Sequence, residues 1–220
     1  MTPLRALPVL VALAAGINCR AGAQVPPAVA TPVSSPATVR PDTGHVGYTA
    51  ADVHFMSGMI HHHAQAIVMA GWAPDHGANQ EIRALCERIV VGQRDEIVLM
   101  QHWLADRHEA VPSGDPSHVY MRGMSMMDPS MMMPGMLTDQ QMAQLDSSRG
   151  PTFDQLFLRF MIQHHEGAIT MVNELFASQG GGEEDNVYRM AANVFADQTT
   201  EIDRMQKMLA ALMFGANNSQ

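Results

Sequence analysis

The sequence predicts an all-α protein, a ferritin-like four-helix bundle made of two duplicated helical hairpins with one long Met-rich crossover. The segment "MIHHHAQAIVM", Met59 to Met69, returns as "MIQHHEGAITM", Met161 to Met171. Each copy is followed by a second related segment, "QRDEIVLMQHWL" and then "QTTEIDRMQKML". The repeated unit is therefore a hairpin. The connection between the two units is much longer than ordinary helix connections, which is typical of a bundle with a crossover.

The N-terminal residues predict secretion. Arg5 precedes the apolar run "LPVLVALAAGI", and "AGA" at Ala21 to Ala23 suits signal peptidase, so residues 1–23 are expected to be a signal peptide. Lipidation at Cys19 is less favoured, because the preceding "GIN" fits a lipobox poorly. Residues 24–47 are rich in proline and alanine without a hydrophobic period, which predicts a disordered tether. We expect a periplasmic or secreted protein with no transmembrane segment in the mature chain.

Composition narrows the range of functions. Cleavage after Ala23 would remove Arg5 and Arg20 and leave 11 basic against 22 acidic side chains, so nucleic acid is not expected as a partner. The mature chain would keep only Cys86, which excludes an intramolecular disulfide. The chain has 20 methionines and 11 histidines. Both residue types are metal ligands.

The bundle domain is expected over residues 48–215, with hairpin one at 48–107, the crossover at 108–150 and hairpin two at 151–213. Thr49 followed by Asp52 predicts a capped start for the first helix, and Thr152 with Gln155 predicts the same for the third. The turn-forming stretches "APDHGA" and "SQGGGEE" are expected to close the two hairpins.

The apolar residues follow helical periods. His61 and Val68 are expected to point away from the apolar stripe of the first helix. That stripe comprises Phe55, Met59, His63, Ala66, Ile67 and Ala70, and the second helix repeats Cys86, Ile89, Gln93, Ile97, Met100 and Leu104.

Histidine pairs lie on the stripes of both hairpins. A single histidine on such a stripe is more often a hydrogen-bonded core residue than a ligand, but the duplication could bring four imidazoles near the bundle axis. Met59 precedes His62 by three residues, so thioether and imidazole can point the same way, and Met161 precedes His164 in the second copy. Thioethers favour Cu(I), with Ag(I) as its mimic, while imidazoles also accept Zn(II).

The crossover segment "HVYMRGMSMMDPSMMMPGM" contains eight methionines. Its glycines and prolines argue against a long buried helix, so the side chains are not all explained as core. Clustered thioethers on a loop can converge on Cu(I). The alternative is an exposed apolar surface that packs over the bundle or binds a hydrophobic partner. For Met69 and Met171, filling of core gaps is the favoured interpretation, with ligation as the alternative. The candidate metal ligands are Met59, His62, His63, Met69, Met161, His164, His165, Met171, Met121, Met124, Met126, Met127, Met131, Met132, Met133 and Met136.

Two polar pairs accompany the second helix of each hairpin. Gln93 and Gln198 lie on apolar stripes, where a buried amide would either orient a histidine or, as we favour, bridge helices. Glu96 and Glu201 follow one turn later, and Glu96 is interpreted as a helix-surface residue.

The chain resembles the bacterial family known as domain of unknown function 305. The resemblance rests on "FMSGMIHHHAQAIVMA" and "FLRFMIQHHEGAITMV", each followed by a helix such as "EIVLMQHWL" or "EIDRMQKML", over about residues 48 to 213. It implies a ferritin-like bundle and, for members of the CopM type, periplasmic binding of copper or silver in copper tolerance. The histidine pairs, their methionines and the crossover methionines would then be the ligands.

Other functions remain as alternatives. A di-iron oxidase needs Glu-x-x-His motifs, and no histidine here has a glutamate three residues before it. A zinc- or iron-dependent enzyme using the histidine pairs is conceivable, but no base or substrate pocket is evident. A non-metal interaction module is the third possibility. We predict a copper-binding protein that sequesters Cu(I) or exchanges it with a donor or acceptor protein. No catalytic residues are predicted.

Overall fold

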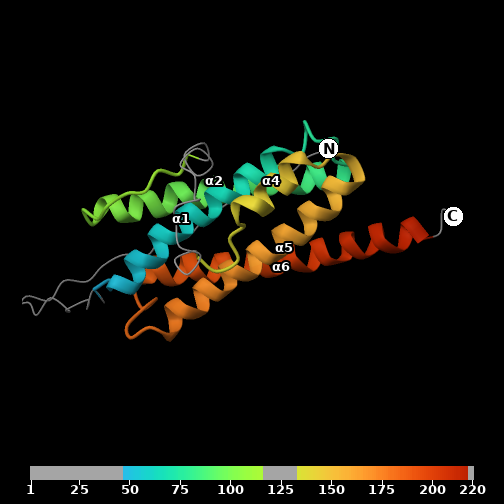
Figure 1. Ribbon diagram of the computed structural model, residues 1–220. Coiled ribbons are helices and arrows are strands. Elements are labelled where there is room, and N and C mark those ends of the chain that lie inside the picture. The colour runs from blue at the N-terminus through green and yellow to red at the C-terminus, as the bar shows by residue number, and fades with distance from the viewer. Residues whose placement is uncertain (1–46, 116–132, 218–220) are drawn as a thin grey trace, which may run out of the picture. The chain divides into compact units, whose positions relative to one another are not determined.

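The computed structural model describes residues 47–115 and 133–217. These parts contain helices and no strands, so the predicted all-α fold is confirmed (Figure 1). Helix α1 pairs with α2 and α5 pairs with α6, and the two hairpins meet where α1 packs against α5. The helices are α1 (Ala50–Gly71), α2 (Gln80–Asp106), α4 (Asp139–Ser147), α5 (Gly150–Ala177) and α6 (Asp185–Asn217). The predicted signal peptide and nearly all of the predicted tether lie outside the described residues.

The start of α1 matches its prediction, whereas the start of α5 does not. The Thr49 hydroxyl accepts from the Asp52 amide at 3.2 Å, and the Asp52 carboxylate accepts from the Thr49 amide at 2.7 Å, forming a capping box. The expected cap at Thr152 is wrong, because α5 begins earlier with Arg149 at the N-cap position and no side-chain cap. Pro151 accounts for this difference, since proline suits the first helical turn and lets the helix start before Thr152.

Each hairpin holds the turn of the other through a buried aspartate. Asp52 of α1 accepts a hydrogen bond at 2.7 Å from the backbone amide of Gly182, in the turn between α5 and α6. Asp154 of α5 accepts from Asn79, which caps α2, at 2.8 Å from the side-chain amide and 3.2 Å from the backbone. The two hairpins are thus joined by reciprocal polar contacts at both ends of the α1–α5 contact.

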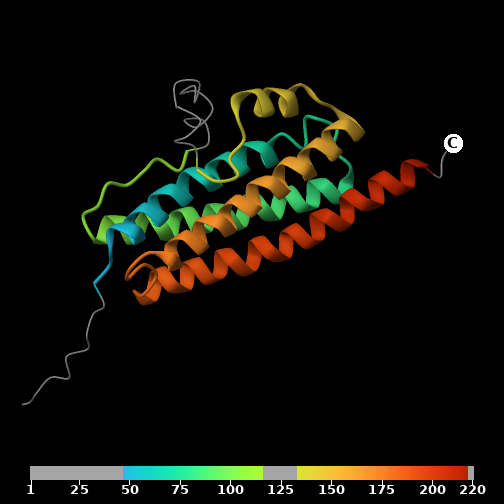
Figure 2. The same ribbon diagram turned by 60° about the horizontal axis from the view of Figure 1, so that its bottom comes forward.

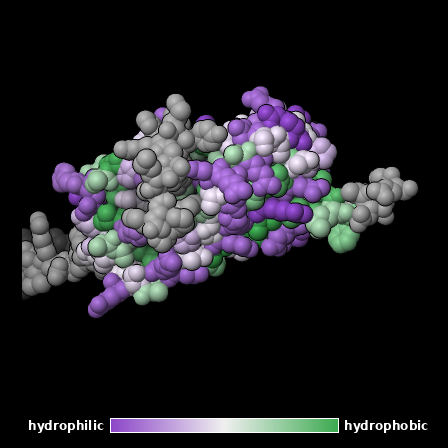
Figure 3. Space-filling view, viewed as in Figure 1, coloured by the Kyte–Doolittle hydropathy of each residue, from purple (hydrophilic) through white to green (hydrophobic). Residues whose placement is uncertain are grey.

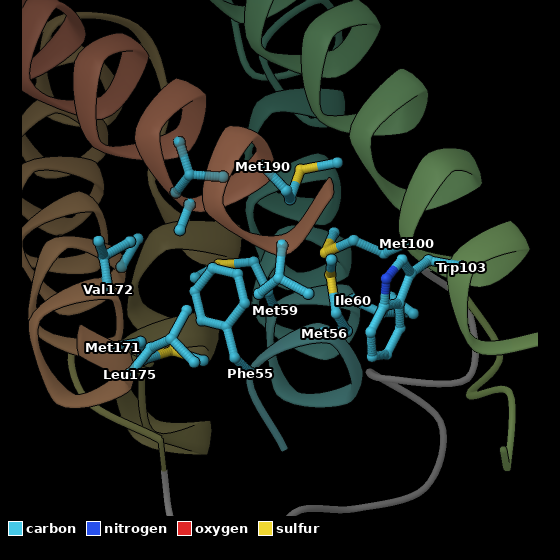
Figure 4. Packing of buried hydrophobic residues seen from close by; sticks show 14 of the residues in the cluster. Phe55, Met56, Met59, Ile60, Met100, Trp103, Met171, Val172, Leu175 and Met190 are labelled. Atoms are coloured by element: carbon cyan, nitrogen blue, oxygen red, sulfur yellow. The ribbon is translucent and has the colours of Figure 1, made fainter. Parts of the chain in front are cut away.

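The predicted stripes of the first hairpin form its buried face. All twelve residues assigned to the two stripes are buried, and His61 is exposed as expected. Val68 is half-buried against the core, so it points away only in part. Figure 4 shows Met56 of α1 and Met100 of α2 extending toward each other within the core. These two methionines fill space between helices.

The end of the crossover lies along α1 and α5 (Figure 2). The side-chain amide of Gln65 donates to the Leu137 carbonyl at 3.1 Å and accepts from the Leu137 amide at 2.8 Å. Gly167 of α5 lies directly beneath the backbone of Pro134 and Gly135, where an added Cβ would clash. Residues 133–137 are therefore fixed against both helices that carry the histidine pairs.

The surface of the described part is mixed in character. Figure 3 shows small apolar areas separated by hydrophilic ones on the face in view. The most exposed large apolar side chain is Phe214, near the end of α6. Within residues 47–115 and 133–217, the helices are too short or too polar to cross a bilayer.

Substitution Asp52→Ala should lower the free energy of unfolding by about 2–3 kcal/mol, because it removes the carboxylate that completes the capping box with Thr49 and leaves the buried Gly182 amide without its acceptor. Urea denaturation followed by circular dichroism measures the change. Asp203→Ala, which removes an exposed carboxylate paired only with Lys207, is the control and should change stability little. Equal effects of the two substitutions would contradict the cross-hairpin role of Asp52.

Candidate metal centre

Four histidine side chains lie where the two hairpins meet. His62 and His63 of α1 and His164 and His165 of α5 are each 0% exposed. The rings of His62 and His164 have centroids 3.8 Å apart, and those of His164 and His165 are 6.3 Å apart. The repeat therefore brings imidazoles from both copies together in the interior. Their assignment as metal ligands stays a prediction.

Two of these imidazoles are held by carboxylates. His63 Nε2 lies 2.7 Å from Glu96 Oε2 of α2, and His165 Nε2 lies 2.7 Å from Glu201 Oε2 of α6. Because a carboxylate only accepts, each Nε2 carries the hydrogen and each Nδ1 keeps its lone pair. A carboxylate behind a histidine is also the usual outer partner of a metal-bound imidazole.

The interpretation of Glu96 as a surface residue is wrong. Its side chain is only 16% exposed and that of Glu201 only 20%. The Gln93 side chain makes no hydrogen bond within the described residues, and Gln198 Oε1 makes none either, so neither the bridging nor the orienting role is observed. The repeated spacing of glutamine and glutamate in both hairpins was the available signal for a role of the glutamates.

Lone pairs remain unused around the imidazole cluster. His62 Nε2 donates to the Pro134 carbonyl at 3.0 Å, which leaves its Nδ1 as an acceptor. Within the described part of the chain, the Nδ1 atoms of His62, His63 and His165 and both ring nitrogens of His164 have no hydrogen-bond partner. An unpaired buried polar atom costs about 1–3 kcal/mol. This concentration of unpaired ring nitrogens between α1 and α5 indicates a site for a ligand that accepts nitrogen lone pairs.

Burial keeps the rings of His62, His164 and His165 neutral. It lowers the pKa of His62 to about 3, with the neighbouring His63 adding to the effect. It also lowers the pKa of His164 well below the usual 6.5. The pKa of His165 is lowered by burial too, although Glu201 opposes the shift. Neutral imidazole is the form that binds metal, so the rings need not lose a proton first.

Thioethers lie close to this cluster. Met59 and Met161, one turn before the histidine pairs, are both 0% exposed. The Met133 sulphur and the Met171 methyl group lie beside Gly58, one turn before His62, each 3.2 Å from the place that a Cβ on this glycine would take. Met69 and Met136 are buried in the core. Met69 packs with a second apolar cluster, separate from the one in Figure 4, which includes Ile82, Leu145 and Phe157. Six candidates lie outside the described residues: Met121, Met124, Met126, Met127, Met131 and Met132.

The histidines do not form a complete metal site by themselves. Within residues 47–115 and 133–217, no three side chains of histidine, cysteine, aspartate or glutamate are positioned to hold one ion. Binding would therefore require thioether sulphur as an additional ligand, or rotation of the imidazole rings. Met133, whose sulphur lies beside Gly58 of α1, is a candidate for such a donor.

Residues 52–209 match the family model described as domain of unknown function (DUF305). A DUF305 protein from Streptomyces coelicolor, provisionally described as secreted, is 29% identical, with 74% of this chain and 93% of that chain covered and a TM-score of 0.59. A DUF305 fragment from Deinococcus radiodurans is 26% identical, with 74% and 97% covered and a TM-score of 0.59.

CopM in the Cu(II)-bound form is 26% identical, with 72% of this chain and 95% of that chain covered and a TM-score of 0.57. The Cu(I)-bound form of CopM is 24% identical, with a TM-score of 0.54, and this comparison shows similarity of fold alone. The comparison with curated proteins finds no match for this chain.

The stability of the metal-free protein should fall as the pH drops below about 6.5. The unfolded chain takes up protons on these histidines near pH 6.5, whereas the pKa of folded His62 is about 3. The contribution of the neutral rings to the free energy of unfolding is therefore fully present above pH 6.5. It decreases toward pH 3 by up to about 1.4 kcal/mol per pH unit for each histidine with a lowered pKa. Urea denaturation between pH 4 and 8 measures the slope.

His62→Leu should make that slope shallower, because one buried proton acceptor is removed. His54→Gln replaces an exposed histidine and should leave the slope unchanged. A slope that is the same in all three proteins would show that the buried rings do not control acid stability.

Proposed function

This chain belongs to the domain of unknown function family DUF305, and from that premise we propose that it is a periplasmic or secreted protein that binds Cu(I), and Ag(I) as its mimic, through histidine and methionine ligands. It would sequester the ion or exchange it with a donor or acceptor protein. The role is binding rather than catalysis.

One observation carries the proposal most directly. Neutral imidazoles from α1 and α5 are buried with unused lone pairs, and thioethers lie one helical turn away. The mixture of imidazole and thioether suits Cu(I), because thioether is a soft ligand and a poor one for magnesium or calcium. The likeness to CopM, which has a Cu(II)-bound form, supports a copper-related role.

The surrounding helices would keep the ligands in place. Glu96 and Glu201 hold His63 and His165 in the tautomer that turns Nδ1 away from the carboxylates. The contact between Pro134 and His62 brings the end of the crossover to the same imidazoles. Met133, at the described end of the crossover, lies beside Gly58 on the helix that carries His62. This coupling agrees with a role in capture followed by storage or transfer.

Zn(II) is the second candidate ion. The pairing of His63 with Glu96, and of His165 with Glu201, is a typical arrangement behind imidazole ligands of zinc. Zinc prefers imidazole, thiolate and carboxylate to thioether. Ligation by methionine therefore distinguishes a Cu(I) site from a Zn(II) site.

Purified protein spanning residues 24–220 should retain Cu(I) and Ag(I) in preference to Zn(II) and Fe(II), because only the first two ions favour thioether ligands. Native mass spectrometry under reducing conditions, with the four ions supplied in parallel, gives the stoichiometry. Replacing all eight crossover methionines by leucine should lower the number of copper ions bound while preserving helicity. Retention of zinc or iron alone would contradict the proposal.

His164→Leu should weaken Cu(I) binding by about tenfold or more, since it removes a proposed ligand. It should leave the stability of the metal-free protein unchanged or higher, because the replaced ring has two unpaired buried nitrogens. Competition with a Cu(I) chelator measures affinity, and urea denaturation measures stability. Met69→Leu, a nearly volume-conserving change in the second apolar cluster, is the control.

Loss of stability in His164→Leu with unchanged copper affinity would assign His164 to the core and remove it from the site.

A further inference from the structure

A solvent-accessible cavity of about 330 Å³ lies between α2 and α6. Its walls include Gln93 and Glu96 from α2, and Gln198 and Glu201 from α6. Each helix therefore contributes a glutamine followed three residues later by a glutamate, a spacing that places both side chains on one helical face. The two glutamates that line the cavity are also the ones that accept from His63 and His165.

The cavity carries a surplus of negative charge. Asp197 adds a third carboxylate, while Arg88 is the positively charged residue among those that line it. The pKa of Asp197 is raised by burial and by repulsion from Glu96 and Glu201, so the three carboxylates interact with one another. A positive charge between them would relieve this repulsion.

Two buried glutamines lack partners at the wall of this cavity. Gln93 is 3% exposed and Gln198 is 2% exposed. Within the described residues, Gln93 Oε1, Gln93 Nε2 and Gln198 Oε1 make no hydrogen bond. Buried amides are normally satisfied by protein or ordered water. Two unpaired amide oxygens beside three carboxylates therefore indicate a ligand that takes oxygen donors.

Each histidine-bound glutamate also keeps a free oxygen. His63 and His165 donate to the Oε2 atoms of Glu96 and Glu201. No hydrogen bond engages the two Oε1 atoms in the described part of the chain. Together with the glutamine oxygens, the cavity presents oxygen donors from both helices and no sulphur.

We propose that this cavity is a second metal site, which binds a hydrated, oxygen-preferring divalent cation between α2 and α6. Such cations bind carboxylate and amide oxygens and retain several waters. Six waters occupy about 180 Å³ at about 30 Å³ each, which the cavity accommodates. Contact through water also fits the absence, in the described residues, of three carboxylates or imidazoles gathered tightly enough to hold an ion directly. Its donor atoms differ from those of the proposed copper site, because it uses neither thioether nor a free imidazole nitrogen.

Gly92 is a position where a substitution should increase the affinity of the cavity for a divalent cation. By the repeat it corresponds to Asp197, it lines the cavity, and nothing lies within 4 Å of a Cβ added there. Gly92→Asp would supply a fourth carboxylate, and Gly92→Asn is an uncharged control of the same shape. We expect Gly92→Asp to bind Mn(II) about tenfold more tightly than Gly92→Asn, as a unit charge a few ångströms from the ion predicts.

The double substitution Gln93→Leu with Gln198→Leu separates a ligand role from a structural one. It should weaken Mn(II) binding while raising the thermal midpoint of the metal-free protein, because unpaired buried amides are replaced by apolar side chains. Electron paramagnetic resonance of free Mn(II) during titration measures affinity, and circular dichroism measures the midpoint, both on residues 24–220 without copper.

Three results would each overturn the proposal: no Mn(II) binding at millimolar concentration, equal affinity in Gly92→Asp and Gly92→Asn, or unchanged affinity with a lowered midpoint in the double leucine protein. The last result would make the glutamines a helix-bridging pair. None of these results bears on Cu(I) retention, so the copper proposal would stand or fall separately.

Discussion

The contact between α1 and α5 buries four imidazoles at the centre of the fold, and much of the remaining structure follows from the need to accommodate them. A buried histidine is tolerated when its ring stays neutral and its N–H group finds an acceptor. Glu96 and Glu201 provide acceptors from α2 and α6, and the Pro134 carbonyl provides one from the crossover. Helices α2 and α6 and the end of the crossover therefore each supply part of this polar interior.

The duplication explains how much of this arrangement could be predicted. The sequence repeats both helices of a hairpin, so the helical fold, the two turns and the buried stripes followed from period and spacing alone. The burial of His62 and His164 could be inferred because each lies beside a stripe in its own copy. Their contact, with ring centroids 3.8 Å apart, depended on α1 packing against α5. That pairing is typical of a bundle made from two hairpins.

The features that the sequence did not predict depend on contacts between distant segments. Glu96 looked like a surface residue because the three residues before it are polar, and only the approach of His63 from α1 makes it part of the interior. The start of α5 was misplaced because a threonine three residues before a glutamine resembles a capping box, whereas Pro151 lets the helix begin earlier. The close approach of Pro134 to Gly167 has no local signal either, because a glycine within a helix usually indicates flexibility rather than a contact.

Glu96 and Glu201 separate two chemically different environments. They contact buried imidazoles, which are borderline donors, and they line a cavity that also has carboxylate and amide oxygens, which are hard donors. Each glutamate uses its Oε2 atom for the imidazole. An ion in the cavity would draw electron density from these carboxylates and weaken them as acceptors for the imidazole N–H groups. Two occupied sites would therefore oppose each other through the shared glutamates, and by linkage the opposition is equal in both directions.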